Sequence, residues 1–191
     1  MSSTRTKILD AAVALVLKRG DAAVTMAHIA KAARLSRQAV YLHFADRADL
    51  MVALVQHVDE KRGMAAEILR VVEAPTGREA LREMALLQAR MNPAVWAAAR
   101  AVDAVRRTDR AAERSWQDRL KHRLEGCRLM IARLEREGEL REHLAPSDAA
   151  DLLWVLTSLR VWEDLVLERN WTAEQYVKHI TEVLFQTLCR P

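Results

Sequence analysis

The sequence predicts an all-α protein with an N-terminal three-helix domain and a larger C-terminal helical domain. Among 191 residues only 5 are glycine and 4 are proline, so residues that break helices are scarce. Apolar residues recur at intervals of three and four positions, and the strict alternation typical of strands is absent. Capping residues precede most of these apolar segments. We expect about nine helices.

The first helix has a single apolar face, and Gly20 is placed to close it at its C-terminal end. Its apolar residues follow the i, i+3, i+4, i+7 spacing of an amphipathic helix. They are Ile8, Leu9, Ala12, Leu15 and Val16.

Two short helices are expected next, capped by Thr25 and Ser36. The first is predicted over 26–33 and the second from 37 to about 43, each with a hydrophobic staple across its start. Only residues 34 and 35 separate them. A connection this short holds two helices at a steep angle, which is the helix-turn-helix arrangement.

Asp46 and Asp49 have the capping spacing of a fourth helix, which is predicted to run to about residue 72. No linker separates it from the third. Gly63 is its weak point. We expect the N-terminal domain to cover 1–46 and the C-terminal domain to cover 47–191.

Capping signals predict five further helices in the C-terminal domain. The signals are Thr76 with Glu79, Asn92 before Pro93, Thr108 with Asp109, Ala145 before Pro146, and Thr172 with Gln175. The second of these helices would start at Pro93, the third would be closed by Gly138, and the fourth would run to about Glu168.

The positive charge of the chain is concentrated at its N-terminus. Residues 1–50 hold eight Lys and Arg against four Asp, whereas residues 51–191 hold 22 residues of each sign. The first fifty residues therefore carry the whole formal net charge of +4. Such an imbalance is compatible with binding a polyanion at this end, although solvated helix faces often show one of the same size.

The sequence lacks the signatures of the common enzyme classes. It contains no G-x-S-x-G, H-E-x-x-H, P-loop or G-x-G-x-x-G motif, and the i, i+4 pairs Asp118 with His122 and Glu139 with His143 are expected to be solvated. The cysteines, Cys127 and Cys189, have no metal-ligand spacing. We therefore expect no catalysis, cofactor, metal or membrane span, and a cytoplasmic location.

The N-terminal block resembles the DNA-binding domain of the TetR (tetracycline repressor-like) family of bacterial transcription regulators. The resemblance covers residues 4–50, and its most specific part is the run Tyr41-Leu42-His43-Phe44 followed by Arg47 and Leu50. It implies a dimeric regulator with a helix-turn-helix head and a variable second domain that commonly binds a small-molecule effector.

The residue types at the start of the third helix suit base recognition. An α-helix fits the major groove, where arginine pairs with guanine and glutamine with adenine. Arg37 and Gln38 supply these side chains, and Ala39 is short enough to touch a thymine methyl. Phosphate contacts are expected from the longer donors and from the two helix starts. The expected phosphate ligands are Thr25, Ser36, Tyr41, His43 and Arg47.

Arg34 occupies a turn position where the family usually has glycine. A positive φ there costs a non-glycine residue about 1 kcal/mol. The turn is therefore either strained or differently shaped. In the strained case we expect Arg34 to contact a phosphate, which would offset the cost.

All five tryptophans lie after residue 95. They either fill the core or line an apolar cavity that binds an effector. The candidate ligand-binding residues are Trp96, Trp116, Trp154, Ser158 and Trp162. His57 and Arg123 are further polar groups that could orient a ligand, but no spacing singles them out.

The last two helices carry apolar faces broad enough to serve both their own domain and a partner. The resemblance implies a homodimer paired through these helices on a near-palindromic double-stranded DNA operator. The function expected is that of a repressor released by an unidentified small-molecule effector. The alternatives are a DNA-binding regulator without an effector and a helical enzyme with a vestigial head.

Overall fold

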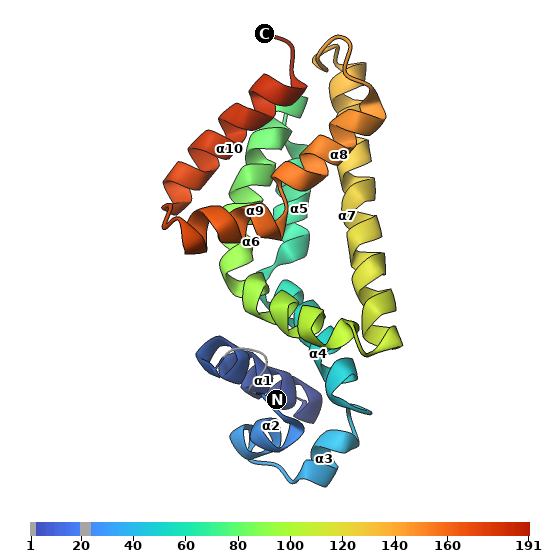
Figure 1. The fold of residues 1–191 in the computed structure, drawn as a ribbon, viewed down its shortest axis with the longest axis vertical. Helices are drawn as coiled ribbons and strands as arrows, with labels where there is room; N and C mark the ends of the chain where they lie inside the picture. Colours follow the sequence, from blue (N-terminus) through green and yellow to red (C-terminus); the bar gives the residue numbers. More distant parts are fainter. Residues whose placement is uncertain (1–2, 20–23) are drawn as a thin grey trace. The chain divides into compact units, whose positions relative to one another are not determined.

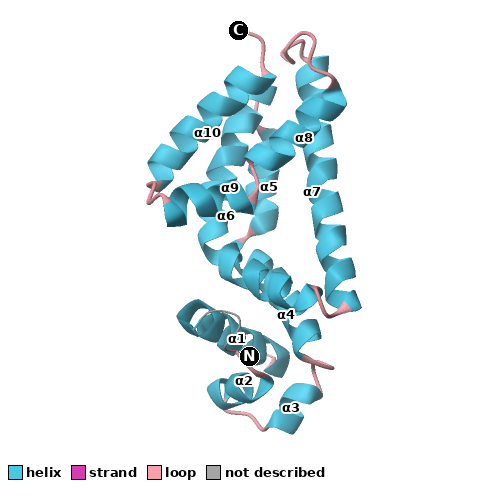
Figure 2. Ribbon diagram, in the orientation of Figure 1, coloured by secondary structure: helices cyan, strands magenta, loops and turns pink. Residues whose placement is uncertain are grey.

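The computed structural model describes residues 3–19 and 24–191, and these residues are helical apart from short loops and one isolated bridge between Leu140 and Cys189 (Figures 1 and 2). The all-α class is confirmed. The described ranges contain ten α-helices and one π-helical segment. They are α1 Thr4–Arg19, α2 Met26–Ala33, α3 Arg37–Tyr41, α4 Arg47–Arg62, α5 Met64–Glu73, α6 Gly77–Arg106, α7 Arg110–Arg136, α8 Pro146–Leu156, α9 Leu159–Trp162, η1 Glu163–Glu168 and α10 Ala173–Leu188.

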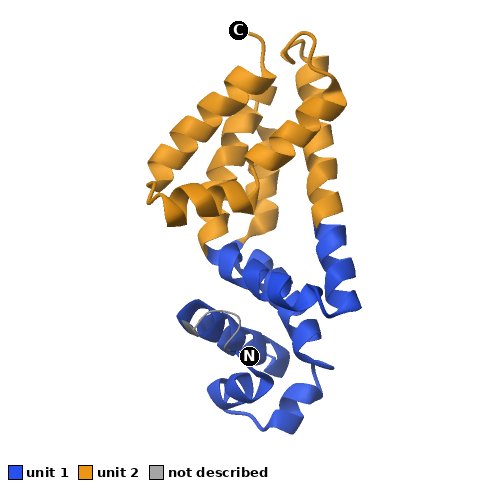
Figure 3. Ribbon diagram, viewed as in Figure 1, with its two compact units in different colours: residues 1–62, 94–119 blue, residues 63–93, 120–191 orange. Residues whose placement is uncertain are grey.

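The chain divides into two compact units (Figure 3). Unit 1 comprises residues 1–62 and 94–119, and unit 2 comprises residues 63–93 and 120–191. The N-terminal helices α1 to α4 all lie in unit 1. The expected division after residue 46 into a DNA-binding and an effector-binding domain stays a prediction.

The N-terminal helices pack around an apolar core to which α1, α2, α3 and α4 all contribute. α1 contacts both α2 and α4, and α2 contacts α3. Burial of these side chains is what holds such short helices in place, because an isolated helix of eight residues is unstable in water. The largest fully buried side chains here are Ile8, Leu9, Ile29, Phe44, Leu50, Met51 and Leu54. Gly20, the expected end of the first helix, lies outside the described residues.

The continuous fourth helix expected to about residue 72 is interrupted at Gly63. α4 ends at Arg62, and Gly63 has φ 74° and ψ 36°, in the left-handed region. A right-handed helix cannot continue through a left-handed residue, so a new helix begins, and its first turn bonds to the Gly63 carbonyl through Ala66 N–H (2.9 Å).

The helix start expected at Pro93 is wrong, because α6 continues through it. Pro93 deprives the helix of one N–H donor, yet Met91 and Val95 on either side are 3% and 4% exposed. Burial on both flanks favours a single helix over two. Asn92, expected to cap the new helix, is instead 5% exposed within α6.

The helix expected from 146 to about 168 breaks at Thr157 and Ser158. The Thr157 hydroxyl donates to the Leu153 carbonyl (2.7 Å), and the Ser158 hydroxyl accepts from Val161 N–H (3.2 Å) to cap α9. Short hydroxyl side chains compete with the backbone for these bonds, so α8 ends and α9 begins. The chain then continues as the π-helical segment η1.

The other capping signals are confirmed. The Asp109 carboxylate accepts from the N–H groups of Ala111 and Ala112, both at 2.8 Å, at the start of α7. Gly138, with φ 73°, follows the end of α7. Thr172 and Gln175 form a reciprocal capping box at α10, as their spacing predicts.

Unit 2 has its own apolar core, with contributions from α6, α7, α8 and α10. Its fully buried residues include Leu81, Leu134, Leu153 and Tyr176. Both cysteines are also buried here and unpaired with each other. Burial raises the pKa of the Cys127 and Cys189 thiols above the ordinary value, as expected for packed thiols in apolar surroundings.

Candidate functional site

The two helix starts of the helix-turn-helix are fixed by hydroxyl caps. Thr25 accepts a hydrogen bond from His28 N–H (3.3 Å), and Ser36 accepts one from Ala39 N–H (3.1 Å). Each hydroxyl uses a lone pair in its cap and keeps its own hydrogen for another acceptor. Both residues are exposed, so their predicted phosphate contacts are sterically available.

Arg34 ends α2 in the left-handed conformation expected of a position where glycine is usual. Its φ is 58° and its ψ is 43°, and Leu35 N–H donates to the Ala30 carbonyl (2.9 Å) to complete the helix end. A non-glycine residue in this region costs about 1 kcal/mol. The turn between α2 and α3 therefore keeps its glycine-like shape, with a positive, exposed side chain added to it.

We expect Arg34→Gly to raise the free energy of unfolding by about 0.5–1 kcal/mol, because it relieves the left-handed strain but gives the unfolded chain more freedom. If the guanidinium contacts a phosphate, the same variant binds DNA more weakly and with a shallower salt dependence. Urea denaturation and a salt titration of DNA affinity measure the two effects. Unchanged DNA affinity would contradict the phosphate contact.

The first turn of α3 presents the two predicted base-contacting residues to solvent. Arg37 and Gln38 are exposed, whereas Ala39 is half-buried and Val40 is 0% exposed. Val40 anchors the helix in the core, which leaves Arg37 and Gln38 on the outer surface. This arrangement suits a recognition helix, whose N-terminal residues contact base edges.

The end of α3 exposes further side chains beside them. Tyr41 is 45% exposed, His43 is exposed, and Leu42 is 80% exposed. Leu42 is not among the predicted DNA contacts, because nothing in the spacing of the sequence marks this leucine as exposed. Its exposure in an otherwise well-packed head makes it an additional candidate for apolar contact with DNA.

Arg47 and Arg5 have structural roles that the sequence did not indicate. Arg47 Nε donates to the carbonyl of Val24 (2.9 Å), so this side chain ties the start of α4 to the residue before the α2 cap. Its predicted phosphate contact stays a prediction. The Arg5 guanidinium lies 5.1 Å from the centre of the buried Phe44 ring, which places a second cation beside the end of α3.

A polar cluster joins α1 to α4. Asp10 accepts a hydrogen bond from Lys61 Nζ (2.6 Å) and interacts with His57 Nε2 (2.7 Å), and His57 is only 8% exposed. Burial works against ionisation of the Asp10 carboxyl, but the hydrogen bonds from Lys61 and His57 outweigh it and lower the pKa. His57, which the sequence offers as a group that could orient a ligand, contacts Asp10 here, and its role toward a ligand stays a prediction.

We expect Asp10→Asn to make the protein less stable at neutral pH, with a deficit that shrinks on acidification. Because the folded-state pKa of Asp10 is lowered, its carboxylate stabilises the fold above the ordinary aspartate pKa, and this contribution is lost as the pH falls through the lowered pKa. Thermal unfolding of both proteins between neutral and acidic pH measures it. A constant difference across that range would contradict the assignment.

The candidate ligand-binding residues are divided between the two units. Trp96 and Trp116 belong to unit 1, and Trp154, Ser158 and Trp162 belong to unit 2. Trp162 is 3% exposed and packs in the core, and the Ser158 hydroxyl caps α9. The Arg106 guanidinium stacks on Trp116 at 5.6 Å. Their role in binding an effector stays a prediction.

Arg123 and Trp154, both half-buried, form a polar contact in unit 2. The Arg123 guanidinium lies 4.9 Å from the centre of the Trp154 ring and donates to the Trp154 carbonyl and to the Thr157 hydroxyl (3.1 Å). The Trp154 indole nitrogen and the Tyr176 hydroxyl are buried, and each lacks a hydrogen-bond partner within the described residues.

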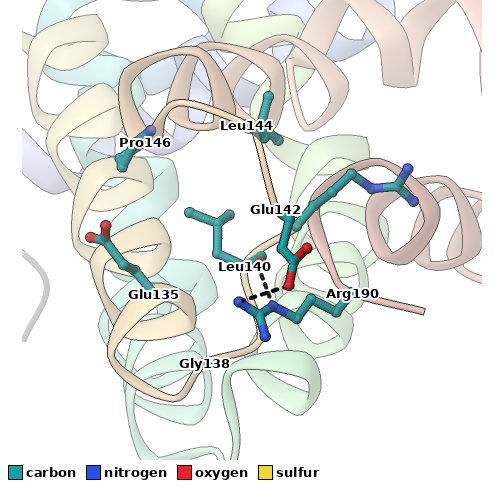
Figure 4. Close-up of a pocket in the computed structure, with 8 residues that line it drawn as sticks. Glu135, Gly138, Leu140, Glu142, Leu144, Pro146 and Arg190 are labelled. Atoms are coloured by element: carbon teal, nitrogen blue, oxygen red, sulfur yellow. Dashed lines mark hydrogen bonds and ion pairs between the residues drawn. The ribbon is translucent and has the colours of Figure 1, made fainter.

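A cavity of about 200 Å³ lies at the loop between α7 and α8 (Figure 4). Arg190 closes one side through an ion pair with Glu142 (3.5 Å) and a hydrogen bond to the Leu140 carbonyl (3.2 Å). None of the tryptophans lines it. The lining residues are Glu135, Gly138, Leu140, Arg141, Glu142, Leu144, Pro146 and Arg190.

The helices α8 and α10 expose apolar side chains. α8 contacts α10, and Leu152, Val155 and Val183 remain 39%, 50% and 39% exposed. The predicted pairing of these helices with a second copy stays a prediction. In residues 3–19 and 24–191 no helix has the length and apolarity needed to cross a bilayer, and no group of three His, Cys, Asp or Glu is arranged to hold a metal ion.

Comparison with known families matches the head of the chain. Residues 8–54 match the family model of "Bacterial regulatory proteins, tetR family". The HTH-type transcriptional regulator TtgR of Pseudomonas putida is 42% identical over 57 residues. That match covers 30% of this chain, and the chain spans only 27% of the length of TtgR.

Solved structures match almost the whole chain in fold. A protein of Saccharomonospora viridis in complex with choline superposes with a TM-score of 0.82 at 16% identity, covering 98% of each chain. NalD, the secondary repressor of the MexAB-OprM multidrug efflux pump in Pseudomonas aeruginosa, gives a TM-score of 0.71 at 25% identity, covering 98% of this chain and 96% of NalD. The relatives with named activities are regulators and repressors rather than enzymes.

Proposed function

We propose that this chain, which belongs to the TetR family of DNA-binding bacterial transcriptional regulators, is a repressor that binds a near-palindromic operator as a homodimer and leaves it on binding a small molecule. The observation that carries the proposal is the exposure of Arg37 and Gln38 on the first turn of a helix whose start is capped and whose inner face is buried. The exposure of these side chains supports the proposal that they pair with guanine and adenine.

Contacts to the phosphate backbone would fix the position of the head on the duplex. The hydroxyls of Thr25 and Ser36 keep a hydrogen for an oxygen acceptor, and Tyr41, His43 and Arg34 are exposed around them. Arg47 is expected to contribute to DNA binding in part indirectly. Its hydrogen bond to the Val24 carbonyl holds the residue before Thr25 in place and so supports the Thr25 cap.

Dimerisation would place two such heads on one DNA molecule. The exposed apolar residues of α8 and α10 support pairing of these helices with those of a second copy, with the same surface used by both subunits. A twofold dimer would require two half-sites related by dyad symmetry in the operator.

Response to a small molecule is supported by the relatives rather than by a bound ligand. The similar protein of Saccharomonospora viridis is in complex with choline, and NalD is a repressor of an efflux pump. Within unit 2 the predicted ligand-binding set comprises Trp154, Ser158 and Trp162. A regulator without an effector is the alternative, and it predicts no ligand-dependent change in tryptophan fluorescence.

The experiment is a selection of tight-binding duplexes from a random DNA pool, followed by measurement of affinity against salt concentration. We expect a single enriched sequence with dyad symmetry, and we expect two protein chains to bind each duplex. A folded protein that enriches no sequence would contradict operator binding. Enrichment of an asymmetric site bound by one chain would contradict the dimer.

A further inference from the structure

We propose that Arg123, Trp154 and Tyr176 form a subsite in unit 2 for the carboxylate of an organic acid. This inference rests on the proposed function, because it specifies the chemical class of the effector. The three residues come from α7, α8 and α10, so the subsite lies where three helices of one unit meet.

Two hydrogen-bond donors in this place have no acceptor. Tyr176 is 0% exposed, and neither its hydroxyl nor the indole N–H of Trp154 has a hydrogen-bond partner within the described part of the chain. Most buried polar groups in proteins are paired, because an unpaired one loses its bonds to water without replacement. Two unpaired donors on the contacting helices α8 and α10 therefore point to a bound acceptor, and a carboxylate has two acceptor oxygens.

The charge beside these donors favours an anion. The Arg123 guanidinium is stacked on Trp154 at 4.9 Å, and its positive charge opposes the large rise that burial produces in the Tyr176 pKa. Its described bonds to the Trp154 carbonyl and the Thr157 hydroxyl hold it in a fixed position. An arginine so held is suited to binding carboxylate oxygens.

The same geometry disfavours a cation such as choline, the ligand in the similar protein of Saccharomonospora viridis. A quaternary ammonium group binds on the face of an aromatic ring. In this chain the Arg123 guanidinium covers one face of Trp154, so a cation bound beside it would meet a like charge.

The test is isothermal titration of the full chain with acetate, benzoate and octanoate, each beside its primary amide, and with choline. We expect at least one carboxylate to bind about tenfold or more tightly than its amide, since only the anion forms a charge-assisted hydrogen bond with the guanidinium. Choline should bind more weakly than that carboxylate. If no carboxylate binds, if the amide binds equally well, or if choline binds more tightly, the proposal is wrong.

Two variants separate recognition from folding. Arg123→Gln should weaken carboxylate binding about 10- to 100-fold and leave amide binding unchanged, with the exposed Arg128→Gln on the same helix as the matched control. Tyr176→Phe removes only an unpaired hydroxyl, so it should keep or raise the thermal stability of the free protein while weakening carboxylate binding. A Tyr176→Phe variant that binds the carboxylate as tightly as the parent would overturn the role of this hydroxyl.

Operator release, measured separately, distinguishes this proposal from the one on which it rests. A carboxylate that binds through Arg123 without affecting operator affinity would support the subsite and contradict release by an effector. Conversely, release of the operator by an uncharged compound that binds equally well to Arg123→Gln would support an effector-responsive repressor and overturn the carboxylate subsite.

Discussion

Replacing Arg37 with alanine should weaken binding to the selected operator by about 10- to 100-fold, because one bidentate pair with guanine contributes about 1–3 kcal/mol of discrimination. Arg37 is exposed on the first turn of α3, so its truncation leaves the buried core around Val40 intact. The measurement is fluorescence anisotropy with the operator duplex and with a duplex of scrambled sequence. The loss on scrambled DNA should be much smaller, since only one charge is removed.

Two comparisons sharpen this experiment. Arg128→Ala removes the same charge from an exposed position on α7 and should leave both affinities nearly unchanged. Gln38→Ala should reduce operator affinity without changing the salt dependence, because glutamine is uncharged. Equal losses on operator and scrambled DNA for Arg37→Ala would show that Arg37 contributes charge rather than base recognition.

Replacing Phe44 with alanine should lower the free energy of unfolding by about 3–5 kcal/mol, the range for a large buried side chain. Phe44 is 1% exposed, follows the end of α3, and is covered by the Arg5 guanidinium. Loss of its ring therefore removes the packing that supports α3. Urea denaturation followed by circular dichroism gives the change in free energy.

Leu42→Ala provides the matched control for this prediction. Leu42 lies two positions away but is 80% exposed, so its truncation should change stability by no more than about 0.5 kcal/mol. Comparing the two variants distinguishes apolar residues that stabilise the N-terminal core from apolar residues exposed on its surface. Similar losses for both would contradict the burial assigned to Phe44.

The head can be predicted closely from the sequence because its signals are local. Thr25 and Ser36 cap the helices that their positions predict, and α2 occupies residues 26–33 as expected. The left-handed backbone conformation of Arg34 was also predictable, because the family that the sequence resembles usually has glycine at this position. Caps and turns depend on residues three or four positions apart, so the sequence contains nearly all of the relevant information.

The errors lie where packing competes with a local signal. Asn92 and Pro93 have the pattern of a helix start, but buried residues on both sides keep α6 continuous. Thr157 and Ser158 interrupt the predicted eighth helix through side-chain bonds to the backbone, which hydrophobic spacing does not reveal. Spacing also cannot assign His57, since its partner Asp10 is 47 positions away in the sequence.

The candidate ligand site is the least predictable part. Five tryptophans suggest a pocket, but spacing alone cannot tell which of them share one environment. That the Trp154 nitrogen and the Tyr176 hydroxyl have no hydrogen-bond partner among the described residues becomes evident only from the structure. Spacing places Tyr176 on an apolar face and does not indicate its hydroxyl as a ligand group.

Because both thiols are buried, a new cysteine can be labelled specifically without first replacing the native ones. Cys127 and Cys189 are 0% and 1% exposed, and the raised pKa of each thiol keeps the reactive thiolate scarce near neutral pH. A maleimide dye should therefore leave the native protein unmodified. Leu42→Cys would then supply the only accessible thiol, and a dye attached there would test whether DNA approaches the end of α3.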